Sequence, residues 1–272
     1  MSEPFDRRLT DLVGTPMKEI EEEFISVVSM QNQIMPDPHL AKVFGDFDIY
    51  GRTLPTAIVG GDFYDFIGME TFNLPGRLAL IIADASGHGL AAAMLIRDLN
   101  TAMFTALEFQ TQYETDTSPI LFEKINRRMH RSSLPNQFIS AFYAELTLTG
   151  RLRYINAGHL PPLLVRRDDH QILDRGGPVL GAFQDLPFPY QVGEVQICPG
   201  DILVGFTDGI TEAFDRETQQ EFGEERLLQT VRAHRSAGSL RLFRRIIEAV
   251  DEFAHHEQTD DQTLVIISLP PG

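Results

Sequence analysis

The sequence has a single cysteine and lacks both long apolar runs and a signal-peptide core, and each of these absences argues against a class of protein. A single cysteine, Cys198, excludes an internal disulfide and fits a reducing compartment. No run of apolar residues approaches the roughly 18 needed to span a membrane. The N-terminus also lacks the apolar core of a signal peptide. From these absences we expect a cytoplasmic protein that does not enter the membrane.

Positive charge is also scarce. The 272 residues include 23 Lys and Arg against 39 Asp and Glu, which gives a formal net charge of −16 at pH 7. Lys and Arg supply the attraction of proteins to nucleic acid and to anionic lipid, so this charge argues against both partners. A substrate that carries phosphate would need another source of positive charge at its binding site.

The remaining composition and patterning predict a packed α+β fold. Hydrophobic residues make up 43% of the chain, enough for a sizeable core. Apolar runs joined by short Gly, Pro, Asn and Asp turns favour antiparallel strands, and the helical segments come in pairs rather than after every strand. We predict strands at 78–84, 138–148, 152–155, 163–166, 192–197, 202–206 and 264–268. We predict helices at 89–107, 119–131, about 223–233 and 239–254.

The first part of the chain has a different pattern. Apolar residues recur at helical spacing from Met17 to Met35, with Glu19 and Glu21–Glu23 between them, and the pattern stops at Pro36. Such an amphipathic helix either packs on its own domain or serves as a dimerising or signal-receiving helix. We therefore divide the chain into an N-terminal helical extension, residues 1–45, and a domain, residues 46–272.

Several aspartates lie beside glycines or at the ends of predicted strands. They are Asp62 and Asp65 in Gly60-Gly-Asp-Phe-Tyr-Asp65, Asp84 in Asp84-Ala-Ser-Gly-His-Gly89, Asp201 and Asp208 on either side of strand 202–206, and Asp260 and Asp261 in Thr259-Asp-Asp-Gln-Thr263. Turn formation explains any one of them, because Asp and Gly are common turn residues. As a set, they indicate oxygen ligands for a hard divalent cation, Mg²⁺ or Mn²⁺ rather than zinc. Two such ions can activate a water for attack on phosphorus.

Five segments together resemble the SpoIIE/RsbU-type branch of the metal-dependent PPM serine/threonine phosphatases over about residues 45–270. They are the Asp62, Asp84 and Asp260 segments, Asn156-Ala-Gly-His-Leu-Pro-Pro-Leu163, and Gly200-Asp201 followed by Thr207-Asp-Gly209. The resemblance implies a four-layer αββα sandwich with two divalent cations, Mn²⁺ or Mg²⁺, at one end. It also implies that a metal-bridging hydroxide hydrolyses phosphoserine or phosphothreonine.

The resemblance assigns roles position by position. It implies that metal ligands are supplied by Asp62, Asp84, the backbone carbonyl of Ala85, Asp208 and Asp260, with Asp261 the less favoured of its pair. His88 falls in the family's Gly-His-Gly segment, where it is a candidate for protonating the leaving alkoxide.

The resemblance also implies partners. The usual substrates in this branch are phosphorylated STAS-domain proteins of bacterial partner-switching pathways. The helix at 17–35 is the expected site for an upstream activator and for a homodimer contact. The alternative is a catalytically silent, phosphatase-like scaffold, and the presence of all the expected acidic residues argues against it. The polar stretch 210–225 is interpreted either as a mobile flap over the site or as a solvated loop.

Overall fold

The computed structural model describes residues 28–29, 34–36, 42–57, 59–110, 118–134 and 136–271. Residues 1–34 and 35–272 form two separate compact units, and both large sheets belong to the second. Nearly all of the helix expected at 17–35 lies outside the described residues, and so do the dimer and activator contacts expected of it.

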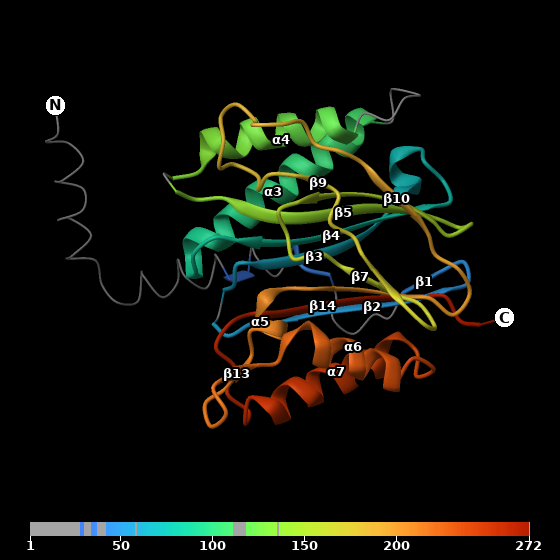
Figure 1. The fold of residues 1–272 in the computed structure, drawn as a ribbon. Helices are drawn as coiled ribbons and strands as arrows, with labels where there is room; N and C mark the ends of the chain where they lie inside the picture. Colours follow the sequence, from blue (N-terminus) through green and yellow to red (C-terminus); the bar gives the residue numbers. More distant parts are fainter. Residues whose placement is uncertain are drawn as a thin grey trace, which may run out of the picture. The chain divides into compact units, whose positions relative to one another are not determined.

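Two sheets form the centre of the second unit (Figure 1). The first, here called the β14 sheet, has the strand order β1 (Lys42–Phe44), β2 (Phe47–Leu54), β14 (Gln262–Ser268), β11 (Ile202–Phe206), β7 (Leu163–Val165) and β8 (His170–Ile172). The second, the β4 sheet, has the order β10 (Gly193–Gln196), β6 (Arg151–Ala157), β5 (Ile139–Thr147), β4 (Arg77–Ala85) and β3 (Asp62–Gly68), and β9 (Gly176–Gly177) pairs with β6. All neighbours are antiparallel except β6 and β9.

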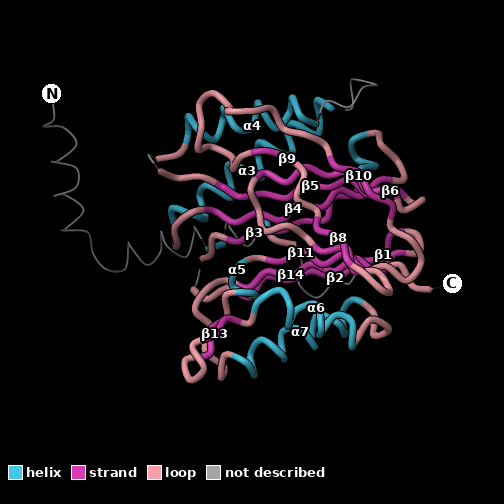
Figure 2. The backbone as a smooth tube through the Cα atoms, in the orientation of Figure 1, coloured by secondary structure: helices cyan, strands magenta, loops and turns pink. Residues whose placement is uncertain are grey.

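A pair of helices covers the outer face of each sheet (Figures 1 and 2). Helices α3 (Gly89–Gln110) and α4 (Ser118–Ser132) cover the β4 sheet, while α6 (Gly223–Ala233) and α7 (Ser239–Phe253) cover the β14 sheet. The shorter elements are η1 (Met69–Phe72), α5 (Asp208–Thr211) and the hairpin of β12 (Phe214–Asp215) and β13 (Gln220–Glu221). The layers therefore follow the order helices, sheet, sheet, helices, which confirms the predicted αββα sandwich.

Strand β14 shows how the sequence produces two apolar layers at once. All seven of its residues are buried. Val265 and Ile267 belong to the core between the sheets, while Leu264 and Ile266 belong to the core under α6 and α7. Successive side chains of a strand point to opposite faces, so an uninterrupted apolar run fits a strand that is covered on both sides.

Helix α3 is the single described helix whose length and composition would suit a membrane span. The stretch Gly89–Glu108 has a mean hydropathy of 1.2, and 39% of it is buried inside the fold. Buried residues such as Ile96 and Leu99 lie on the face that contacts the rest of the domain. This packing accounts for the apolar composition of α3.

Candidate metal centre

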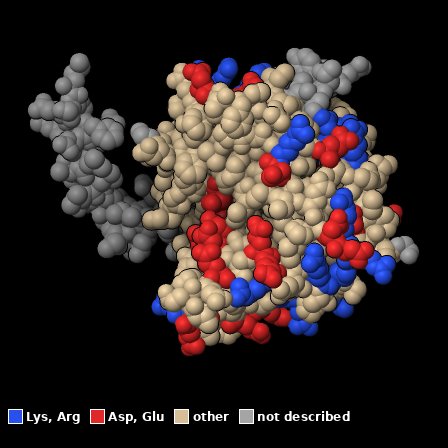
Figure 3. Space-filling view, in the orientation of Figure 1, with Lys and Arg blue, Asp and Glu red and all other residues tan. Residues whose placement is uncertain are grey.

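The predicted aspartates come from four chain segments that end at the same edge of the sandwich. Asp62 begins β3 and lies directly opposite Asp84 in the antiparallel register of β3 and β4. Asp208 follows β11, while Asp260 precedes β14, and these two strands are neighbours in the β14 sheet. Figure 3 shows Asp and Glu side chains gathered on the face over α5 and the adjoining strand ends. By contrast, Asp201 lies at the opposite end of β11, where it forms an ion pair with Arg166.

Asp62 joins the two sheets. Its Oδ2 accepts hydrogen bonds from the hydroxyls of Thr207 and Thr263, each at 2.7 Å. Asp62 belongs to the β4 sheet, whereas Thr263 lies in β14 and Thr207 directly follows β11. The side chain is buried, and this burial raises the carboxyl pKa well above its usual range. The Thr207 hydroxyl opposes the rise, and the neighbouring Asp84 and Asp261 charges add to it.

Asp84, Asp208 and Asp260 form an electrostatic cluster without a basic partner. Burial raises the pKa of Asp84 to about 7, and the charges of Asp208, Asp260 and Asp261 contribute to the rise. Burial and the charge of Asp260 likewise raise the pKa of Asp208. Within the described residues, none of these three carboxylates forms an ion pair with Lys, Arg or His. Such uncompensated negative charge favours the binding of a cation.

A further acidic side chain, Glu212, joins the cluster and was missed by the sequence reasoning. Its pKa is raised by partial burial and then by the charge of Asp208, with smaller contributions from Glu221 and Asp260. Its backbone N–H donates to the Asp208 carbonyl at 2.7 Å, which closes the single turn of α5. The signal in the sequence was the spacing of four residues from Asp208, which places both side chains on one side of a helical turn.

Asp261 differs from Asp260, although the two are adjacent. Its Oδ1 accepts the backbone N–H of Thr56 at 2.8 Å, and its Oδ2 accepts that of Gly61 at 3.0 Å. A Cβ on Gly60 would lie 2.0 Å from Asp261 Oδ2, so glycine is needed for the loop to approach this carboxylate. In this arrangement Asp261 holds the loop before β3, whereas Asp260 is exposed.

The backbone carbonyl of Ala85 lies near the carboxylate of Asp84. Its N–H donates to the Gly61 carbonyl at 3.0 Å. A Cβ on Gly61 would lie 2.9 Å from the Ala85 carbonyl oxygen and 3.5 Å from Asp84 Oδ1. These two oxygens therefore face the same space beside Gly61.

His88 lies on the exposed turn between β4 and α3. Its side chain makes no hydrogen bond or ion pair with any residue that the structure describes. The turn nevertheless follows Asp84 directly, so the imidazole is attached to the segment that carries the carboxylate. Its predicted role as a proton donor stays a prediction.

The stretch after α5 is an ordered hairpin. Asp215 receives the backbone N–H groups of Glu217 at 2.8 Å and Thr218 at 3.2 Å, together with the Thr218 hydroxyl. These hydrogen bonds, that of the Thr218 hydroxyl first, lower the carboxyl pKa to about 2. His255 Nε2 lies 3.3 Å from Asp215 Oδ1 and links the hairpin to the segment after α7. Residues 214–215 and 220–221 pair as β12 and β13, and residues 216–221 are exposed to solvent, so this part of 210–225 is a solvated hairpin. The interpretation as a mobile flap stays a prediction.

The donor set fits a hard divalent cation. It consists of carboxylate and carbonyl oxygens, which Mg²⁺ and Mn²⁺ prefer. In the arrangement described, no three acidic, His or Cys side chains of the described residues surround one point closely enough to hold an ion.

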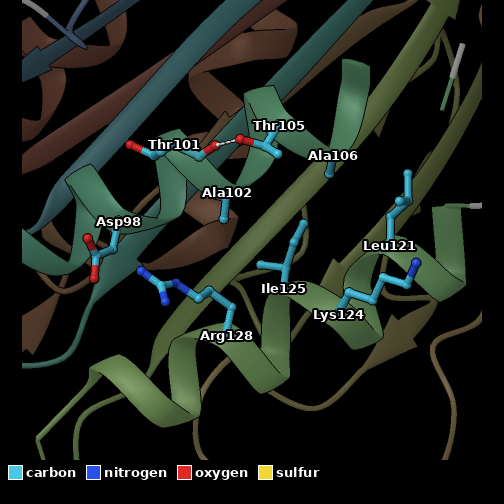
Figure 4. A pocket seen from close by; sticks show the side chains of 9 residues that line it. All are labelled: Asp98, Thr101, Ala102, Thr105, Ala106, Leu121, Lys124, Ile125 and Arg128. Atoms are coloured by element: carbon cyan, nitrogen blue, oxygen red, sulfur yellow. Dashed lines mark hydrogen bonds between the residues drawn. The ribbon is translucent and has the colours of Figure 1, made fainter. Parts of the chain in front are cut away.

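A groove between α3 and α4 is separate from this centre (Figure 4). It has a volume of about 490 Å³ and is lined by apolar and small side chains together with Asp98, Lys124 and Arg128. None of its lining residues belongs to the acidic cluster, so the groove is not part of the candidate metal centre.

Comparison with known proteins identifies the family of the chain. The family model described as Stage II sporulation protein E (SpoIIE) matches residues 75–270, which is most of the chain. The chain belongs to the SpoIIE family. This match includes the segments of Asp84, Asp208 and Asp260, whereas Asp62 lies before its first residue.

Several named proteins are similar to this SpoIIE-family chain. It is 27% identical over 226 residues to phosphoserine phosphatase RsbU of Bacillus subtilis, covering 81% of this chain and 62% of RsbU. The SiaA-PP2C domain of Pseudomonas aeruginosa has the same fold, with a TM-score of 0.74 at 20% identity over 92% of this chain and 97% of that domain. RsbX, solved in complex with magnesium, has a TM-score of 0.57 at 14% identity, covering 82% of this chain and 95% of RsbX. The chain spans less than two thirds of the curated relatives that it matches.

Proposed function

We propose that this chain is a Mn²⁺- or Mg²⁺-dependent protein serine/threonine phosphatase. The observation that carries the proposal is the group of uncompensated carboxylates at one edge of the sandwich, in a chain of the SpoIIE family. The phosphoserine phosphatase activity named for RsbU and the magnesium bound by RsbX support the same reaction and cofactor here.

Asp62, Asp84, Asp208, Asp260 and the Ala85 carbonyl would hold two divalent cations, with Glu212 beside them. When bound, such ions supply positive charge to the phosphoryl group and lower the pKa of water. The chain's own contribution is to fix the carboxylates. The Thr207 and Thr263 hydroxyls hold Asp62, and the short helix α5 directs Asp208 into the cluster.

The proposed substrate is a phosphoserine or phosphothreonine on a STAS-domain protein. The support is the family and the names of its members RsbU and RsbP, both phosphoserine phosphatases. Homodimer formation and an activator acting on the helix at 17–35 stay predictions. The alternative of a silent scaffold differs in one respect: it would bind the phosphorylated partner without releasing phosphate.

The test is substitution of two carboxylates that come from different sheets. We expect Asp84→Asn and Asp208→Asn each to lower Mn²⁺-dependent phosphate release on the order of 10²-fold or more, because each removes charge directed at the reacting centre. Release is measured with a phosphorylated STAS protein and with an aryl phosphate, and circular dichroism verifies the fold.

Asp46→Asn is the matched control, because Asp46 is exposed in the turn between β1 and β2, away from the cluster. Wild-type protein that binds the phosphoprotein but releases no phosphate with either metal would favour the scaffold. Full activity in Asp84→Asn and Asp208→Asn would remove the assignment of the site.

A further inference from the structure

His159 is buried in the turn after β6. The side chain of Asn156 closes this turn: its Oδ1 accepts the His159 backbone N–H at 2.7 Å, and its Nδ2 donates to the His159 carbonyl at 3.0 Å. The position of the imidazole is therefore fixed by its own turn. Neither the cation ligands nor the proposed reaction uses this side chain.

The imidazole lies between β5, the neighbour of the strand that carries Asp84, and the end of β11, the strand that Asp208 follows. Its Nδ1 is 2.9 Å from the Ser140 hydroxyl, and Ser140 is the residue directly opposite Asp84 in the register of β4 and β5. On its other side, the ring interacts with the backbone carbonyl of Phe206, two residues before Asp208. One side chain thus contacts both sheets at the edge where Asp84 and Asp208 meet.

Burial favours the neutral form of the ring. Burial lowers the pKa of His159 to about 4, and the Phe206 carbonyl opposes this only in part. A carbonyl can only accept a hydrogen, so the Nε2 hydrogen faces Phe206 and Nδ1 accepts the Ser140 hydroxyl.

The Nε2 atom is also buried without a hydrogen bond of normal length and angle among the described residues. A buried nitrogen left in this state is costly, and an apolar side chain of similar size would avoid that cost. Space filling alone therefore does not explain an imidazole at this position.

We propose that His159 is a positioning residue for the cation centre. It sets the spacing between the strand end of Asp84 and the segment of Asp208 by contacting Ser140 and the Phe206 carbonyl. The inference rests on the proposed function, because it concerns the geometry of the same site. It predicts that the contacts of His159 affect cation affinity more than they affect the stability of the fold.

The experiment measures Mn²⁺ binding by calorimetry and thermal unfolding for the same set of variants. His159→Phe fills the space without hydrogen bonds, and we expect it to weaken Mn²⁺ binding about 10-fold or more, as loss of groups that orient metal ligands does. His159→Asn keeps a polar group near the Nδ1 position and should recover most of that affinity. Ser140→Ala removes only the hydroxyl and should weaken binding in the same direction.

Ser239→Ala is the matched control. Ser239 is fully buried and its hydroxyl donates to Asp48 at 2.7 Å, and Asp48 pairs with Ser268 at the end of β14 opposite Asp260. We expect this variant to lower the unfolding temperature and leave Mn²⁺ affinity unchanged.

Wild-type affinity in both His159→Phe and Ser140→Ala would overturn the inference while the proposed function stands. If His159→Phe fails to fold, Ser140→Ala alone decides in the same way. Wild-type protein that binds no Mn²⁺ would overturn both the inference and the proposed function.

Discussion

Asp260 and Asp261 are adjacent, but their surroundings give them different tasks. The carboxylate of Asp261 is buried and receives two backbone N–H groups, while Asp260 is exposed and its charge raises the pKa of Asp84 and Asp208. The first arrangement stabilises a loop, and the second leaves a carboxylate available to a cation.

This difference predicts opposite effects of alanine at the two positions. Asp261→Ala should lower the free energy of unfolding by about 2–4 kcal/mol, because two backbone donors lose a charged acceptor. Asp260→Ala should leave that free energy nearly unchanged and weaken Mn²⁺ binding. Urea unfolding in the presence of a chelator measures the first quantity, and calorimetry the second. Equal loss of stability in both variants would contradict the assignment.

The sequence was sufficient to find most of the acidic residues, because strand ends and glycines mark them locally. It was not sufficient to find what holds them. Thr207 lies 145 residues from Asp62, and Thr263 lies 201 residues from it, so their hydrogen bonds appear only when the two sheets pack. His159 was visible as part of a motif, but its contacts with both sheets were not.

At the scale of elements, the hairpin of β12 and β13 depends on one carboxylate. Asp215 organises the turn through Glu217 and Thr218 and contacts His255 beyond α7. Because the hairpin directly follows α5, an ordered hairpin also restrains the segment that carries Glu212.

We expect Asp215→Ala to open this hairpin while the sandwich stays folded. Cleavage by trypsin at Arg216 should become several-fold faster, because local opening exposes the backbone to the protease. Glu217→Ala is the control, since the structure uses the backbone N–H of Glu217, and not its side chain, in the turn. Unchanged cleavage in Asp215→Ala would show that other contacts order the hairpin.

The elements that the sequence predicted well are those with a clear period or composition. The bounds predicted for β11 and α6 agree with the structure, and those for α3, α4 and α7 differ by few residues. The strand β3 was not predicted, because its Asp62 and Asp65 interrupt the apolar alternation. Strands β8, β9, β12 and β13 are two or three residues long, too short for a period to appear.

At the scale of the whole molecule, part of the charge of −16 is concentrated at one edge of the sandwich. Carboxyl groups with a raised pKa bind protons more tightly in the folded chain than in the unfolded chain. Stability from such groups therefore falls as pH rises from the unfolded pKa, about 4, towards the folded pKa, which for Asp84 is about 7. His159 has the opposite effect below its unfolded pKa of about 6.5, because the folded chain keeps it neutral.

Comparison of the wild type with Asp84→Asn separates these contributions, because both proteins contain His159. In the presence of a chelator, we expect the variant to gain unfolding temperature over the wild type between pH 5 and pH 8. One pKa unit corresponds to about 1.4 kcal/mol, so even part of the Asp84 shift would change the unfolding temperature by several degrees. A difference that stays constant across this range would show that Asp84 carries little of the repulsion.

The position of β14 has a consequence for how the protein is made. This strand lies between β2 and β11, and its contact with β2 joins residues 210 positions apart, as for Thr53 and Thr263. During synthesis, β2 leaves the ribosome long before its neighbour exists, and contacts of such long range form slowly. The segment that closes the sheet also brings Asp260 to the cluster, so an unfinished chain holds an incomplete set of carboxylates. We therefore expect a nascent chain to have no phosphatase activity until residues 260–268 have emerged and paired.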